Sequence, residues 1–143
     1  MFHFSLQRVL DYRVQLEDQA KVRFARAQAE YFAAERRLEA LHLQLAEQEK
    51  RLYEGNPDWM ERWLIEHYVR GLRDDIARTA RLAHELARVV EEARLELMDK
   101  AKDRKVLDKF RERQATRHAY EERLQEQRIY DEASSIRYKV AAL

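Results

Sequence analysis

Residues that interrupt helices are scarce in this sequence, and they gather at one place. The 143 residues include only two glycines and one proline, and Gly55, Asn56 and Pro57 follow one another. Glycine suits the left-handed residue just past a helix end. Asn56 followed by Pro57 is typical of an N-cap and a first helical residue. The prediction is one coiled-coil domain, residues 1–143, with a helix at about 5–54, a turn at 55–58 and a helix at about 57–140.

The start of the first helix carries signals of its own. Ser5 has a side chain that can cap the first turn. Phe4, just before it, can pack onto Val9 as a hydrophobic staple. We therefore expect the first helix to begin at Ser5.

Apolar residues recur in both halves at alternating spacings of three and four. The first stripe is Phe24, Ala27, Tyr31, Ala34, Leu38, Leu41, Leu45, Gln48 and Leu52. The second stripe is Ile65, Val69, Leu72, Ile76, Thr79, Ala83, Leu86, Val90, Ala93 and Leu97. Repeats sustained over several heptads indicate a coiled coil.

The two stripes can be aligned across the turn. If Leu52 faces Ile65, then Leu10 meets Leu107 near the far end of the first helix. The fold class is therefore predicted to be all-α, with two long helices in an antiparallel coiled-coil hairpin. The second helix is longer, and residues 112–143 form a C-terminal overhang without an internal partner.

The same alignment places two like charges opposite each other, Arg13 and Arg104. Long basic side chains can turn aside while their stems stay packed, here toward Glu17 and Asp103. Alternatively, both arginines await an acidic surface on a partner. The sequence leaves these two interpretations open.

Composition argues against several classes of function. Twenty-eight basic and 27 acidic residues leave a formal net charge of +1, so the whole chain has no pull toward nucleic acid or an anionic membrane. No apolar run approaches the roughly 20 residues of a membrane span, and no signal peptide is visible. Two glycines cannot form a phosphate-binding loop, and the five histidines are scattered without ligand spacing. We expect no enzyme, cofactor, metal, small-molecule substrate or direct membrane insertion.

Three surfaces remain as candidates for binding. The overhang carries an apolar stripe at helical spacing, which indicates either a docking face or a frayed tail; the stripe is Ile129, Ala133, Ile136 and Val140. Near the turn, aromatic residues either close the end of the coiled coil or anchor a partner; they are Tyr53, Trp59, Trp63 and Tyr68. Residues 100–113 are rich in Lys and Arg, which indicates a solvated face, an acidic protein partner or, least favoured, RNA.

Two groups of residues also match a known family. The first is Phe2, Phe4, Leu6, Val9, Leu10, Arg13, Glu17, Asp18 and Ala20, and the second is Arg104, Lys105, Val106, Leu107, Lys109, Phe110, Asp131, Glu132 and Ala133. Arg62 with Trp63 follows the turn as in some members. With the chain length, the central turn and the unequal helices, this set resembles the FliJ family of bacterial flagellar export proteins over nearly the whole chain.

The resemblance implies a non-enzymatic component of the flagellar type III export apparatus, which serves flagellum biogenesis, motility and chemotaxis. Members resemble the central stalk of rotary ATPases. The implied partners are a hexameric export ATPase, an export gate membrane protein and export chaperones. The implied location is cytoplasmic, at the cytoplasmic face of the inner membrane beneath the flagellum.

The resemblance also assigns the candidate surfaces to partners. The ATPase surface comprises Phe4, Leu6, Arg13, Arg104, Ile129, Ala133, Ile136 and Val140. The gate surface comprises Tyr53, Trp59, Trp63, Tyr68 and Leu72. The alternative function is a structural or chaperone-like scaffold that self-associates through its C-terminal helix.

Overall fold

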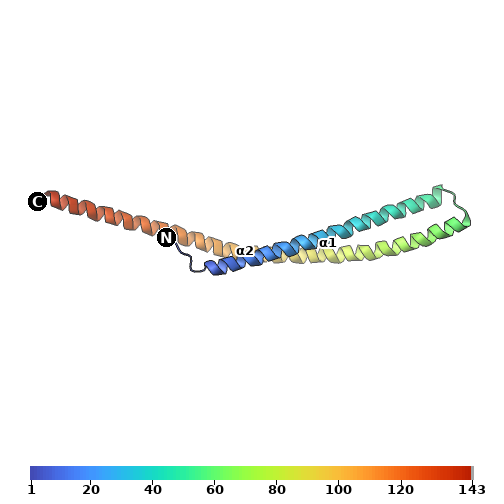
Figure 1. The fold of residues 1–143 in the computed structure, drawn as a ribbon, viewed down its shortest axis with the longest axis horizontal. Helices are drawn as coiled ribbons and strands as arrows, with labels where there is room; N and C mark the ends of the chain where they lie inside the picture. Colours follow the sequence, from blue (N-terminus) through green and yellow to red (C-terminus); the bar gives the residue numbers. More distant parts are fainter. Residues whose placement is uncertain (143) are drawn as a thin grey trace. The chain divides into compact units, whose positions relative to one another are not determined.

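The chain folds into two helices joined by one short turn. The computed structural model describes residues 1–142, so Leu143 of the predicted overhang lies outside the described residues. Helix α1 spans Gln7–Glu54 and helix α2 spans Trp59–Ala142 (Figure 1). The two helices form an antiparallel coiled-coil hairpin, and α2 is longer, with 84 residues against 48. The predicted fold class is confirmed.

The contacts between the helices divide the chain into two units. One unit is Asp18–Asp99, which includes the turn, and the other combines Met1–Glu17 with Lys100–Leu143. Each unit therefore contains a piece of α1 and a piece of α2.

The turn differs from the prediction in its backbone conformation. Asn56, not Gly55, has the positive φ, at 45°. Asparagine tolerates this left-handed conformation better than most residues. Gly55 is needed for a steric reason instead, because an added Cβ would lie 2.6 Å from the carbonyl oxygen of Arg51. That oxygen accepts the hydrogen bond from the Gly55 amide that closes α1.

The start of α2 is set by Asp58 rather than Asn56. The Asp58 side chain accepts a hydrogen bond from the amide of Glu61 at 2.8 Å, and its backbone carbonyl accepts one from the amide of Arg62 at 2.9 Å. Together these bonds define an N-cap residue. The predicted helix start at residue 57 is therefore wrong, because the left-handed Asn56 cannot adopt the extended conformation of a cap.

The start of α1 also differs from the prediction. The carbonyl of Leu6 accepts the first helical hydrogen bond, from the amide of Leu10 at 2.9 Å, so Leu6 takes the cap position that was expected for Ser5. Phe4 packs with Leu10 and Leu107, while Val9 is exposed. Phe4 therefore packs into the core between the two helices, and it does not form the predicted hydrophobic staple with Val9.

The hydrophobic core lies along the predicted stripes. In the unit Asp18–Asp99, every residue of both stripes is buried or half-buried. In the other unit, Leu10 and Leu107 belong to one buried cluster, as the alignment across the turn predicted. The periodicity therefore identified the core of the hairpin correctly.

Candidate interaction surfaces

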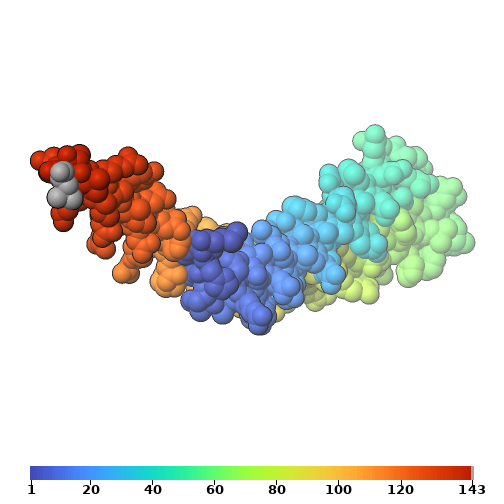
Figure 2. All heavy atoms as spheres, turned by 60° about the vertical axis from the view of Figure 1, so that its left-hand side comes forward, coloured from blue at the N-terminus to red at the C-terminus, as the bar shows by residue number. Residues whose placement is uncertain are grey.

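Residues 1–6, here called the N-terminal segment, cover part of α2. Phe4 is only 3% exposed and meets the ring of Phe110 edge-on, with the ring centres 5.8 Å apart. Phe2 is half-buried and lies beside His118, with a ring separation of 5.7 Å. The amino group of Met1 is 3.9 Å from the carboxylate of Glu122. Figure 2 shows these first residues against the orange part of α2.

This cover shortens the stretch of α2 that has no partner. The prediction placed its start at residue 112, but four residues beyond that point are half-buried: Gln114, Ala115, His118 and Ala119. Every residue from 120 to 142 is exposed. The prediction was wrong about the start because it stopped the pairing at the first residues of α1, whereas the N-terminal segment that precedes α1 reaches further along α2. The exposed end of α2, residues 120–142, is the free part.

The predicted apolar stripe lies on this exposed end. Ile129 is 66% exposed, and Ala133, Ile136 and Val140 are exposed as well. Spacings of four, three and four residues place all four on one face of the helix. Eleven residues, or about three turns, separate Ile129 from His118, so the stripe continues the face that the N-terminal segment covers.

Arg13 and Arg104 are both occupied within the hairpin. Arg104 donates through Nε to the Glu17 carboxylate and through a terminal nitrogen to Asp108 at 2.6 Å. These hydrogen bonds, of which the one to Glu17 has the largest influence, raise the pKa of the Arg104 guanidinium. Arg13 donates to the backbone carbonyl oxygen of Asp103 at 2.8 Å. The first interpretation of this like-charged pair is therefore confirmed, except that Arg13 binds the main chain of Asp103 rather than its carboxylate.

The aromatic residues near the turn are on the surface. Trp59 is 76% exposed, and Tyr53, Trp63 and Tyr68 are exposed too. Trp63 stacks on His67 one turn later, with ring centres 5.5 Å apart and planes 5° apart. Leu72, which was grouped with them, is 4% exposed and belongs to the core beneath. The four aromatic side chains are thus open to solvent instead of closing the end of the coiled coil.

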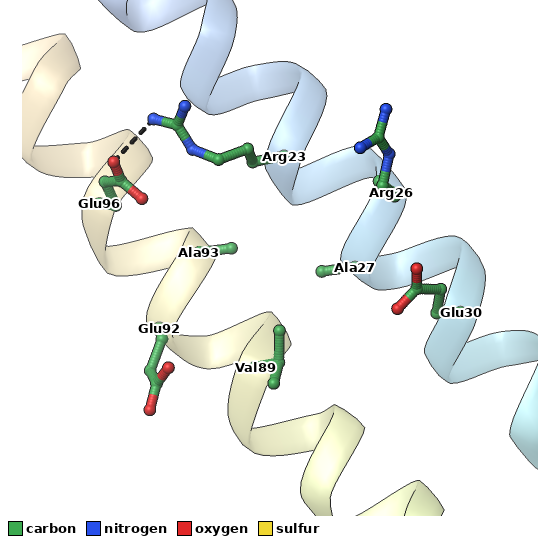
Figure 3. Close-up of a pocket in the computed structure, with 8 residues that line it drawn as sticks. All are labelled: Arg23, Arg26, Ala27, Glu30, Val89, Glu92, Ala93 and Glu96. Atoms are coloured by element: carbon green, nitrogen blue, oxygen red, sulfur yellow. Dashed lines mark hydrogen bonds and ion pairs between the residues drawn. The ribbon is translucent and has the colours of Figure 1, made fainter.

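A shallow hollow lies between the helices in the unit Asp18–Asp99 (Figure 3). It is lined by Arg23, Arg26, Ala27, Glu30, Val89, Glu92, Ala93 and Glu96. The side chains of Ala27 and Ala93 point toward each other, and two small residues leave space between the helices. Arg23 closes one end by an ion pair with Glu96 at 2.7 Å. The hollow exists because the facing seam residues, Ala27 and Ala93, are small. The Arg23–Glu96 ion pair lies at one end of it.

The basic stretch, residues 100–113, is mostly exposed. Lys102, Lys105, Lys109, Arg111 and Arg113 are exposed, and Lys100 is half-buried. Arg104 is the member that is held in the ion pairs with Glu17 and Asp108. This arrangement is that of a solvated face with one basic residue withdrawn into the hairpin.

Within residues 1–142, no three or more His, Cys, Asp or Glu side chains are grouped so that they could hold a metal ion. Neither helix, over the part that the structure describes, contains a stretch long and apolar enough to cross a membrane.

Comparison with protein-family models gives a match over nearly the whole chain. A family model described as "Flagellar FliJ protein" matches residues 2–142. The search of curated proteins and the search of solved structures each find no match. The family match includes the N-terminal segment, both helices and the turn between them.

Proposed function

The chain belongs to the FliJ family of flagellar proteins, and on this premise we propose that it is a non-enzymatic stalk of the flagellar export apparatus. In this role it binds and stimulates the hexameric export ATPase and connects it to the export gate. It also binds export chaperones, and it works at the cytoplasmic face of the inner membrane. Family membership itself supports the broader statement that the chain is a component of the flagellar export machinery.

The single observation that carries the ATPase contact is the exposed end of α2. Its apolar stripe is open to solvent, although a solvated helix of a stable hairpin has no reason to keep a repeated apolar face. Of the residues assigned to this contact, Ile129, Ala133, Ile136 and Val140 form the stripe itself. Leu6 is exposed at the edge of the N-terminal segment.

The other assigned residues support this surface from within. Phe4 is buried and holds the N-terminal segment against α2. Arg13 and Arg104 link the two helices near the start of α1. In the proposed function they keep the base of the exposed end rigid, rather than contacting the ATPase through free charges.

The gate contact is proposed for the aromatic surface near the turn. Exposed Trp and Tyr side chains are the residues that most often dominate the energy of a protein interface. Trp59, Trp63, Tyr53 and Tyr68 supply four of them, and Leu72 lies beneath in the core. The chaperone contact rests on family membership alone and is assigned no surface.

The ATPase contact is tested by measuring ATP hydrolysis by the cognate hexameric ATPase. The full chain is expected to raise the rate. A chain ending at Arg123 keeps the segment that Met1 and Phe2 contact but lacks the stripe, and it is expected to raise the rate far less. The double variant Ile129→Ser with Ile136→Ser is expected to behave like the shortened chain.

The matched control is Tyr138→Ser, which removes an exposed aromatic residue about half a turn away from the stripe. It is expected to stimulate as the unaltered chain does, and circular dichroism should show equal helix content. Equal stimulation by the full chain, the shortened chain and the double variant would rule out docking through the stripe.

The gate contact is tested by titrating the cytoplasmic domain of the gate protein with the chain in a calorimeter. Trp59→Ala and Trp63→Ala are each expected to weaken binding by about 2 kcal/mol, the size of a hot-spot loss. Phe32→Ala removes an exposed aromatic residue of α1 away from the turn and serves as the control. Unchanged affinity for both tryptophan variants would contradict the assignment.

A further inference from the structure

The exposed end of α2 carries a regular pattern on both sides of its apolar stripe. Glu132 and Lys139 are seven residues, or about two turns, apart and lie along one edge. Tyr130 and Arg137 have the same spacing and lie along the opposite edge. All four are exposed. In coiled-coil terms, these are the positions that flank the core and choose the partner helix.

This pattern is complementary to itself when the second helix runs in the opposite direction. With the two-fold axis between Ser134 and Ser135, Ile129 meets Val140 of the second copy, and Ala133 meets Ile136 of the second copy. A small side chain faces a large one at the centre, which close packing requires.

The two edges agree with the same alignment. In an antiparallel pair each edge faces the equivalent edge of the other helix, so Glu132 comes beside Lys139 of the second copy. On the other edge, Tyr130 comes beside Arg137, which allows a cation–π contact. The two-fold axis repeats both contacts, so each pair contains two of each.

A parallel arrangement is disfavoured by two acidic residues on the same face. Glu122 and Glu126 precede Ile129 by seven and three residues, which places them in line with the stripe. Parallel copies would set each glutamate against its own equivalent, where like charges repel. In the antiparallel pair Glu126 comes near the basic end that contains Lys139.

We propose that two copies of this chain pair through residues 127–142 of α2 as an antiparallel coiled coil, with Ile129 against Val140 and Glu132 against Lys139. The pairing is independent of the proposed function, since it needs only the chain itself. One consequence does rest on that function: the pair covers the stripe assigned to the ATPase, so the second copy and the ATPase compete.

The chain contains no cysteine, which permits a direct test of the arrangement. Two differently tagged forms of the full chain, Ile129→Cys and Val140→Cys, are mixed and oxidised. The antiparallel pair is expected to give the mixed disulfide in excess over either disulfide between identical chains. Two copies of Ile129 would lie about 16 Å apart along such a pair, beyond the roughly 7 Å that a disulfide spans between Cα atoms.

Each other outcome counts against the proposal. Preferred disulfides between identical Ile129→Cys chains would show a parallel pair. Yields no higher than those of Leu43→Cys, an exposed position on α1, would show random collision and no pair. Neither measurement includes the ATPase, so a failed pairing leaves the proposed function intact. In the same way, a failed ATPase test leaves the proposed pairing intact.

A charge exchange tests the edges. Sedimentation equilibrium is expected to show a dimer of the unaltered chain that is several-fold weaker in Glu132→Lys. Combining Glu132→Lys with Lys139→Glu in the same chain restores the facing opposite charges and is expected to restore the dimer. A double variant as weak as the single one would overturn the proposed alignment.

Discussion

The carboxylate of Glu17 in α1 accepts a hydrogen bond from the guanidinium Nε of Arg104 in α2. Glu17 is buried and Arg104 is half-buried, and Asp108 holds a second nitrogen of the same guanidinium. This group links the two helices beside the cluster of Phe4, Leu10 and Leu107. It also resolves the alignment of Arg13 with Arg104, because each arginine has its own acceptor.

Replacing Glu17 should therefore destabilise the hairpin. Glu17→Gln removes the charge opposite Arg104 at a buried position, and the expected loss is about 1–3 kcal/mol in the free energy of unfolding. Urea unfolding followed by circular dichroism measures it. Glu85→Gln breaks the exposed pair with Arg88 and should change stability by less than about 0.5 kcal/mol. Equal losses of stability in the two variants would show that the Glu17–Arg104 pair stabilises the hairpin no more than an exposed ion pair does.

Shortening Leu107 should cost more than shortening its neighbour. Leu107 packs with Phe4 and Leu10, whereas the adjacent Val106 is exposed. Leu107→Ala leaves a cavity and is expected to lower the free energy of unfolding by about 2–5 kcal/mol. Val106→Ala should stay within about 0.5 kcal/mol of the unaltered chain. Thermal unfolding of both variants checks the difference, and a small effect at Leu107 would place it outside the core.

The two glycines should respond in opposite directions to alanine. Gly55→Ala brings a Cβ against the Arg51 carbonyl oxygen and should destabilise the chain by more than about 1 kcal/mol. Gly71 is helical with no atom near an added Cβ, so Gly71→Ala should stabilise by up to about 1 kcal/mol through helix propensity. Midpoints of chemical unfolding report both signs. A neutral Gly55→Ala variant would mean that the turn relaxes freely.

Acidification should weaken a local ion pair on α2. The hydrogen bond from Arg94 to Glu91 lowers the pKa of the Glu91 carboxyl below its ordinary value of 4.5. A carboxyl with a lower pKa in the folded state adds stability above its unfolded pKa, and that contribution disappears as the pH falls through the folded pKa.

Glu91→Gln lacks this contribution at every pH. Its melting temperature is therefore expected to fall less between about pH 7 and about pH 3 than that of the unaltered chain. Glu39→Gln, an exposed position on α1, controls for the loss of one carboxylate. The interpretation fails if Glu91→Gln and the unaltered chain follow the same curve.

Much of the fold could be predicted from sequence because the signals involved are local. Alternating spacings of three and four identified the seam, from Leu52 and Ile65 at the turn to Leu10 and Leu107. The helix boundaries near the turn were less accurate. Several neighbouring residues there suit a cap, and only the backbone shows that Asn56 is left-handed and Asp58 takes the cap.

The candidate surfaces were predicted in part. The stripe is exposed, as its spacing suggested, and the aromatic residues near the turn, for which two interpretations were open, are exposed too. Phe4 and Leu72, which were assigned to these surfaces, are buried. One sequence feature could have indicated that the N-terminal segment packs on α2, namely the two phenylalanines, Phe2 and Phe4, on either side of His3. Their contacts with Phe110 and His118 join residues that are more than 100 positions apart, so no local pattern points to them.

The sequence by itself determined that this protein is a two-helix hairpin, where its seam runs and which family it belongs to. These follow from helix breakers, periodicity and characteristic residues, all of which act over a few neighbouring positions. Only the tertiary structure decided that Glu17 neutralises Arg104, and that the N-terminal segment covers α2 as far as Ala119. It thereby decided how much of α2 stays free, because that depends on which distant residues come into contact when the chain folds back.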